Sequence, residues 1–154
     1  RSAELAEEIG ATNLNVERTW LEIARIYLGE RQLVEAQVAL ERAQRHAAHA
    51  GSGSEETEAI RLLAWTHAEQ NHLPEAASTF QRGLRLAEQR GDEPSTALML
   101  YGLAMVQAAS GREVDALVSI DRALEIATRL GLPHRDEIRA RREEIRGRIA
   151  TGKG

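Results

Sequence analysis

The sequence predicts an all-α protein made of antiparallel helix pairs, and three observations carry this prediction. The chain repeats itself with a period of 40 residues, its apolar content is mostly alanine and leucine with only 3% aromatic residues, and a glycine follows each candidate repeat. Alanine and leucine favour close-packed helices over a sheet. Glycine just after a helix is a common stop. At 154 residues the chain is long enough for one domain with a sizeable core.

Three segments of 34 residues align without gaps, at 17–50, 57–90 and 97–130. Positions one period apart form columns, and several columns hold only small or only bulky residues. The small columns are Ala24/Ala64/Ala104, Ala36/Ala76/Ala116 and Ala43/Gly83/Ala123, and the bulky ones are Trp20/Ile60/Leu100, Ile23/Leu63/Leu103 and Leu40/Phe80/Ile120. Small residues let two helix axes approach, and large ones at three- and four-residue spacing fill the groove beside them. Each segment is therefore predicted to be a helical hairpin.

The turns inside the hairpins are predicted near 29–32, 70–72 and 110–112. Pro74 stands at the start of the second helix of the middle repeat, where its missing N–H costs nothing. The segments between repeats open with the helix stops Gly51, Gly91 and Gly131. The predicted caps of the helices that follow are Ser54, Ser95 and Asp136.

Both ends of the chain continue the helical pattern. Residues 2–10 are predicted to end the second helix of a preceding repeat, because their Leu-Ala pair and glycine match 86–91 at about two periods. Residues 134–150 form a predicted capping helix that is charged nearly throughout and should be rich in intrahelical ion pairs. A start that reads as mid-helix, without Met, suggests a fragment of a larger polypeptide.

The first repeat carries the spacing Trp-x2-Leu-Gly-x2-Tyr and Ala-x3-Phe through Trp20, Ile23, Ala24, Tyr27, Ala36, Leu40 and Ala43. In this spacing the chain resembles the tetratricopeptide repeat (TPR) family over residues 17–130. The resemblance implies a right-handed α-solenoid, a TPR-like superhelix of antiparallel helix pairs, as a single domain over 1–154. Tyr27 gives way to His67 and Gln107, and the usual terminal proline is missing. Together with six added residues per period, its loss predicts longer helices.

Periods of 40 residues are similar to those of kinesin light chains, cell-polarity adaptors and bacterial LuxR-type regulators related to the maltose activator. The resemblance implies that the first helices of successive repeats line a concave face that binds a protein or peptide. Transferred by column, this predicted partner-binding surface comprises Arg18, Leu21, Glu22 and Arg25, then Glu58, Arg61, Leu62 and Trp65, then Leu98, Tyr101 and Met105.

These side chains indicate a groove with basic character at one end and an apolar, aromatic floor at the other, which suits an amphipathic or an extended acidic peptide. Trp65 and Tyr101 are the candidate anchors, because rigid aromatic side chains bury much area with little loss of rotamer entropy. Packing in the core is an equal alternative for both residues. Trp20, in a hairpin-core column, is predicted to pack.

Other kinds of chemistry have little support in the sequence. Twenty basic against 24 acidic residues leave no chain-wide positive field for nucleic acid or an anionic membrane. The chain has no cysteine, His46 and His49 lack a third metal ligand, and there is no phosphate-binding loop or nucleophile motif. We expect neither an enzyme nor a cofactor or metal site. No signal peptide or membrane-length apolar run occurs, so a cytoplasmic location is expected.

The leading functional prediction is a protein-protein interaction scaffold that holds a peptide or helix of a partner, with no direct contact to nucleic acid or membrane. Two alternatives stay open. The chain could be the sensor or assembly segment of a larger bacterial transcription regulator, with the DNA contacts elsewhere. It could also be a self-associating module that forms a homo-oligomer through its repeat ends.

Overall fold

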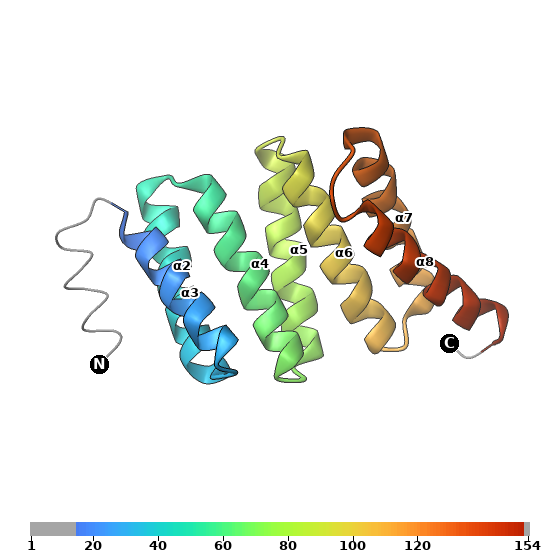
Figure 1. Ribbon diagram of the computed structural model, residues 1–154, viewed down its shortest axis with the longest axis horizontal. Coiled ribbons are helices and arrows are strands. Elements are labelled where there is room, and N and C mark those ends of the chain that lie inside the picture. The colour runs from blue at the N-terminus through green and yellow to red at the C-terminus, as the bar shows by residue number, and fades with distance from the viewer. Residues whose placement is uncertain (1–14, 153–154) are drawn as a thin grey trace. The chain divides into compact units, whose positions relative to one another are not determined.

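The structure is a computed structural model that describes residues 15–152, where all regular structure is α-helical (Figure 1). The helices of this part are α2 (Val16–Gly29), α3 (Leu33–Ala50), α4 (Gly53–Glu69), α5 (Leu73–Gln89), α6 (Glu93–Ala109), α7 (Glu113–Leu130) and α8 (Arg135–Ala150). The predicted helix end at residues 2–10 lies outside the described residues. The chain divides between His72 and Leu73 into two compact units. Unit 1 runs to His72 and unit 2 begins at Leu73.

The helices from α3 to α7 each have 17 or 18 residues, as the long period predicts. Each long connection between repeats is reduced to a tight helix stop. Gly51, Gly91 and Gly131 have the left-handed φ values 72°, 65° and 65°. One residue later, an amide donates back to the carbonyl oxygen five residues earlier, at 2.8 Å for Ser52 to Ala47. This bond pattern satisfies carbonyls that a helix end would otherwise leave unpaired.

Because the helices begin so soon after these glycines, the predicted caps Ser54, Ser95 and Asp136 are wrong. The helix α6 is capped by Asp92, whose carboxylate accepts the amide of Ser95 at 3.2 Å and its hydroxyl at 2.7 Å. Ser54 and Asp136 likewise lie inside α4 and α8. Pro74 is the second residue of α5, where the sequence predicts it.

Unit 1 is built by α2 packing on α3 and α3 packing on α4, with a further contact between α2 and α4 (Figure 1). Trp20 is 2% exposed and packs in a core cluster with Leu40 and a set of alanines, which confirms the packing role predicted for it. The guanidinium of Arg42 lies 4.8 Å from the centre of the Trp20 ring. Stacking of this kind stabilises a cation on an aromatic face.

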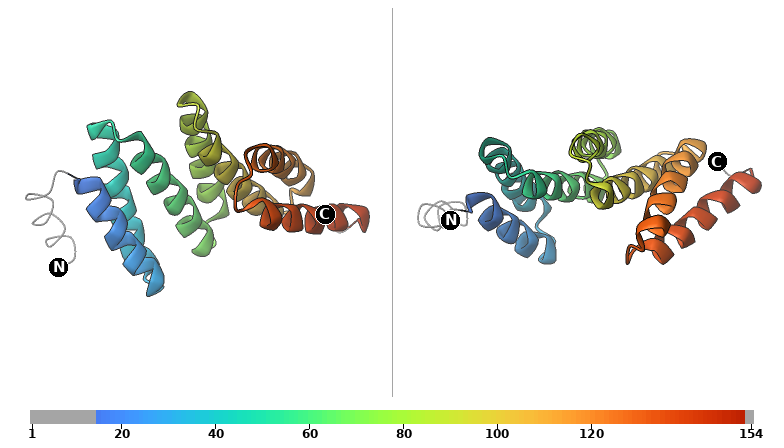
Figure 2. Two further views of the ribbon diagram at one scale, coloured as in Figure 1. Left: turned by 45° about the horizontal axis from the view of Figure 1, so that its top comes forward. Right: turned by 90° about the horizontal axis from the view of Figure 1, so that it is seen from above.

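Unit 2 is built by α5 packing on α6, α6 on α7 and α7 on α8, and Figure 2 shows the same neighbours from two further directions. Its core combines alanines with isoleucines, among them Ile120 of α7 and Ile138 and Ile145 of α8. The helices α5 and α6 approach closely at Gly102, where a Cβ atom would lie 2.2 Å from Cε1 of Phe80. Small residues on facing helices permit this approach.

None of the helices in the described part of the chain combines the length and the apolar character that a membrane span needs.

Candidate partner-binding surfaces

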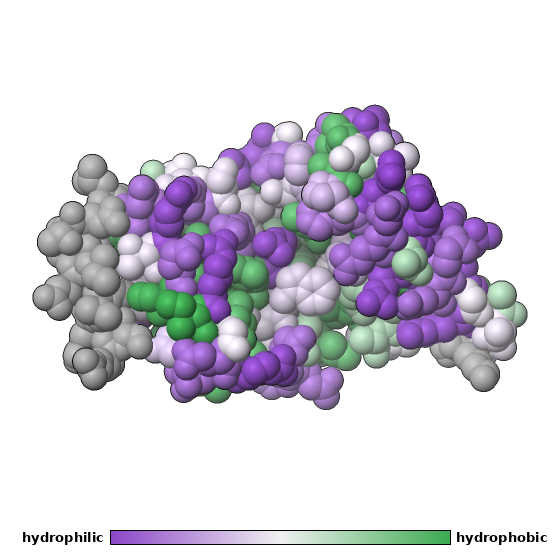
Figure 3. All heavy atoms as spheres, viewed as in Figure 1, coloured by the Kyte–Doolittle hydropathy of each residue, from purple (hydrophilic) through white to green (hydrophobic). Residues whose placement is uncertain are grey.

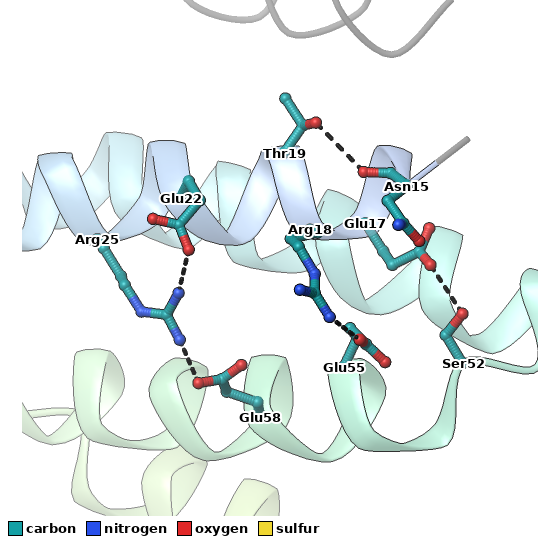
Figure 4. A network of polar contacts seen from close by, with 9 residues as sticks. All are labelled: Asn15, Glu17, Arg18, Thr19, Glu22, Arg25, Ser52, Glu55 and Glu58. Atoms are coloured by element: carbon teal, nitrogen blue, oxygen red, sulfur yellow. Dashed lines mark hydrogen bonds and ion pairs between the residues drawn. The ribbon is translucent and has the colours of Figure 1, made fainter. Parts of the chain in front are cut away.

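In unit 1 the first helices of two repeats, α2 and α4, are linked by a row of polar contacts (Figure 4). Arg18 of α2 donates to Glu55 of α4 at 2.8 Å. One helical turn further along α2 lies Glu22, and Arg25 bonds both to Glu22 and to Glu58 of α4. The arginines of α2 therefore face glutamates in the first two turns of α4. We call this row the α2/α4 network.

The α2/α4 network changes the expected charge of this surface. The predicted basic end does not occur, because each arginine of α2 is already neutralised by a carboxylate. The local balance is three against three, with Arg18, Arg25 and Arg61 set against Glu22, Glu55 and Glu58. A long acidic segment would meet as much repulsion as attraction here. Exposed pairs such as these contribute little to stability singly, about 0–1 kcal/mol, and more as a network.

Arg61 of α4 stands apart from this row. It is half-buried, and burial lowers the pKa of its guanidinium, with the positive charge of Arg25 adding to the effect and the carboxylate of Glu58 opposing it. A lowered pKa means that the surroundings of Arg61 disfavour its charged form. Glu58 precedes Arg61 by one helical turn, but its carboxylate is bonded by Arg25.

The apolar candidates of unit 1 divide into two groups. Leu21 is 1% exposed and belongs to the core cluster with Trp20, so its prediction as a partner-binding residue is corrected: it faces α3 and α4 rather than a ligand. Leu62 packs at the margin of this cluster and remains half-buried. Trp65, one turn after Arg61 on α4, is also half-buried. Leu62 and Trp65 each keep a face that a partner could contact.

In unit 2 the candidates lie on α6 and all three are half-buried: Leu98, Tyr101 and Met105. Tyr101 and Met105 pack against the core cluster that contains Ile138 of α8. The hydroxyl of Tyr101 donates to the carboxylate of Glu137 at 3.0 Å. Burial raises the pKa of Tyr101 above its ordinary value, and a hydrogen bond with Arg141 opposes that rise. Tyr101 thus joins α6 to α8, which is the packing alternative rather than a free anchor.

The acids that complete these contacts, Glu55 and Glu137, are not among the predicted partner-binding residues. A usable signal was present, because both lie 36 or 37 residues after the side chain that they contact, a little less than one repeat period. The buried Glu17 follows the same rule, since its carboxylate accepts the hydroxyl of Ser52, 35 residues later, at 2.7 Å. Polar partners at this separation are not confined to first helices, because 36 residues also separate Arg129 of α7 from Glu93 of α6, which it bonds.

The outer side of α8 is strongly polar, and Figure 3 shows hydrophilic side chains over most of this helix. The predicted intrahelical pairs are confirmed at Arg139–Asp136, Arg141–Glu144 and Arg146–Glu143. Arg142 instead reaches Asp121 on α7. All arginines of α8 except Arg148 are bonded to acids in the structure, so the helix carries a mixed charge pattern.

The histidines add no metal site in the part of the chain that the structure describes, where no three candidate ligands come together. His46 and His49 are both exposed on α3. Arg122 of α7 bonds to Glu88 of α5 at 2.6 Å, which is a contact between the second helices of neighbouring repeats.

Comparison with known proteins finds likeness in structure and not in sequence: no family model and no curated protein matches the chain. The apo form of RapI superposes with a TM-score of 0.84 at 11% identity, over 88% of this chain and 50% of that one. A Podosopora anserina protein described as a kinesin light chain with nearly identical TPR-like repeats gives 0.74 at 20% identity, over 88% and 66%.

BtubC (BKLC) from P. vanneervenii gives a TM-score of 0.71 at 20% identity, over 85% of this chain and 55% of that one. The chain thus spans about half to two thirds of the length of these three solved structures. At such identities the likeness concerns the fold. The prediction from the repeat columns is confirmed at that level: the chain is an all-helical repeat protein with the TPR-like fold.

Proposed function

We propose that this chain is a protein-interaction scaffold that binds a peptide or a helix of a partner protein on the first helices of its repeats. The TPR-like fold supports a scaffold in general terms. The observation that carries the proposal is on α4, where Arg61, Leu62 and Trp65 lie within little more than one helical turn and all remain half-buried. A large aromatic side chain beside an aliphatic one and an arginine is the composition of interface hot spots.

Each part of this α4 surface has a distinct use. The indole of Trp65 offers area that a partner can bury with little loss of side-chain entropy. Leu62 is supported from behind by the core cluster of unit 1, so it presents a firm apolar contact. The α2/α4 network beside them holds both helices in register, because its bonds run from α2 to α4. A preorganised surface of this kind loses less entropy on binding than a mobile one.

The test uses a display library of random 12-residue peptides selected on the full chain, followed by affinity measurements with fluorescent copies of the selected peptides. Replacing Trp65 by Ala should weaken binding by about tenfold or more, the loss expected of a hot-spot residue. The matched control is Val38→Ala, an exposed residue on the second helix α3, which should leave the affinity unchanged. Circular dichroism confirms that both variants are equally helical.

Two results would overturn the proposed function. The library could yield no peptide that binds the chain, or the selected peptides could bind the Trp65 variant and the wild type alike. Sedimentation of the chain alone over a range of concentrations identifies self-association as the competing use of the same repeats.

A further inference from the structure

Arg61 is exceptional among the arginines of residues 15–152, because it alone is half-buried while the structure gives it neither a bonded acid nor a stacked aromatic ring. The other half-buried arginines are occupied: Arg42 stacks on Trp20, and Arg135 and Arg142 each bond to an acid. The arginines for which the structure gives no bonded acid elsewhere in this range are exposed to water: Arg45, Arg82, Arg85 and Arg148. Water satisfies these exposed guanidinium groups, whereas it reaches Arg61 only in part.

The surroundings of Arg61 explain why it has no bonded acid among residues 15–72 of unit 1. Glu58 lies one turn before it on the same helix, but Arg25 bonds that carboxylate and also holds Glu22. The positive charge of Arg25 is close enough to disfavour the charged form of Arg61, in the same direction as burial. A guanidinium carries five N–H donors, and partial burial without acceptors for them costs free energy. The free chain therefore bears a cost that an anionic ligand would remove.

We propose that Arg61 binds a carboxylate of the partner peptide. This inference rests on the proposed function and adds the chemical class of the contact. The planar guanidinium fork matches the two oxygens of a carboxylate and can bond both at once. It lies on α4 within one turn of Leu62 and Trp65, the residues proposed to carry the apolar contact.

A carboxylate fits the local charge better than a phosphate does. Arg18 and Arg25, the other cations of this surface, are already paired with glutamates, so a single positive charge is left for the ligand. A phosphate brings nearly two negative charges. The negative charge that Arg61 does not neutralise would be repelled by Glu22, Glu55 and Glu58 nearby. A singly charged carboxylate is neutralised by Arg61 alone.

The experiment is a double-mutant cycle on the peptides selected from the display library against the full chain. Each selected peptide is remade with every Asp or Glu replaced singly by Asn or Gln, and once with an amidated carboxyl terminus. These replacements separate a side-chain carboxylate from the terminal one. Affinities are measured for the wild type, Arg61→Gln and Arg61→Lys, with Arg45→Gln as the matched control at an exposed arginine that has no bonded acid in the structure.

We expect one replacement in each peptide to weaken binding to the wild type by about tenfold or more, the value of a hydrogen bond between charged groups. The same replacement should have almost no effect on Arg61→Gln, and Arg45→Gln should behave as the wild type. Arg61→Lys should keep part of the affinity, because it keeps the charge and loses the fork.

Peptides that bind the wild type and Arg61→Gln equally well would overturn the role of Arg61 and leave the scaffold function standing. Peptides whose affinity changes by the same factor in both proteins when the acid is removed would do the same. A library that yields no binding peptide would overturn both proposals together. Phosphopeptides that bind more tightly than their carboxylate counterparts would contradict the charge argument.

Discussion

The two units use the surfaces of their first helices differently. In unit 1, α2 and α4 are joined at the surface by arginine–glutamate pairs. In unit 2, α6 is joined to α8 by a tyrosine hydroxyl above a core of isoleucines. One column of the repeat shows the contrast, because it holds a buried leucine, a half-buried arginine and a tyrosine bonded to the next helix: Leu21, Arg61 and Tyr101. The repeat column sets the position of a side chain on its helix, and the residues packed around that side chain decide whether a partner can contact it.

The largest effect on stability should come from substitutions in the column Glu22/Leu62/Gly102. Gly102→Ala places a methyl group against Phe80 and should destabilise the chain by about 1–3 kcal/mol, as overpacking does. Glu22→Ala, at the exposed position that the same column occupies on α2, should change the stability by about 0.5 kcal/mol or less. Urea unfolding of both variants measures the difference.

The control for helix propensity is Gly147→Ala in α8, where the new methyl group would meet no atom within 4 Å. There the same substitution should stabilise by about 0.5–1 kcal/mol, since alanine loses less backbone entropy than glycine. Equal signs for the two glycine variants would show that α5 and α6 do not pack as closely as described.

A smaller effect should follow the removal of the Tyr101 hydroxyl, which tests whether α6 and α8 are joined by a bond. Tyr101→Phe should cost about 0.5–1.5 kcal/mol near neutral pH. Because the pKa of Tyr101 is raised in the folded chain, its contribution is present below the pKa of the unfolded tyrosine and is lost as pH rises through the folded value.

Thermal unfolding of wild type and Tyr101→Phe between pH 8 and 11, a range set by the usual tyrosine pKa of about 10, measures this loss. The two proteins should become more alike toward the alkaline end. Tyr27→Phe on α2 is the matched control in unit 1. A constant difference between wild type and Tyr101→Phe across the range would show that packing of the ring, and not the hydroxyl, links α8.

The smallest effect concerns the ion pairs. Arg129 lowers the pKa of Glu93 chiefly through its hydrogen bond, and the lowered value places the stabilisation above the pKa of the unfolded glutamate. Acid removes it as the pH falls through the folded value. Glu93→Gln should therefore unfold at lower urea concentration than wild type at pH 7 and at nearly the same concentration below the glutamate range, with Glu35→Gln, an exposed acid, as control. A pH-independent difference would remove the electrostatic explanation.

The repeat columns predicted most of the fold. Close helix packing and the backbone geometry of helix ends restrict certain positions to alanine or glycine, and these positions are visible in the sequence. The buried Trp20, the glycine stops and the charged last helix all follow from local chemistry. The helix starts were missed by a few residues, since Asp92 and not Ser95 caps α6.

The candidate site was less predictable from the sequence. Whether Arg25 is available depends on Glu58 of the next repeat, and whether Tyr101 is available depends on Glu137. Such contacts join side chains more than 30 residues apart, and the columns treat each repeat separately. Leu21 shows the same limit, because its burial is set by α3 and α4 together. Prediction of such a surface therefore needs the pairing between repeats as well as the pattern within them.

The glycine stops also bear on how a chain of this kind can change its length. Because Gly51, Gly91 and Gly131 recur at the repeat period and share one backbone conformation, a segment running from one glycine to the next carries its own terminator. Duplication or deletion of such a segment joins equivalent backbone positions and leaves no mismatched end. Insertion of a further segment of this kind between Gly91 and Gly131 should therefore preserve the helix ends. An insertion or deletion that begins inside a helix would interrupt that helix.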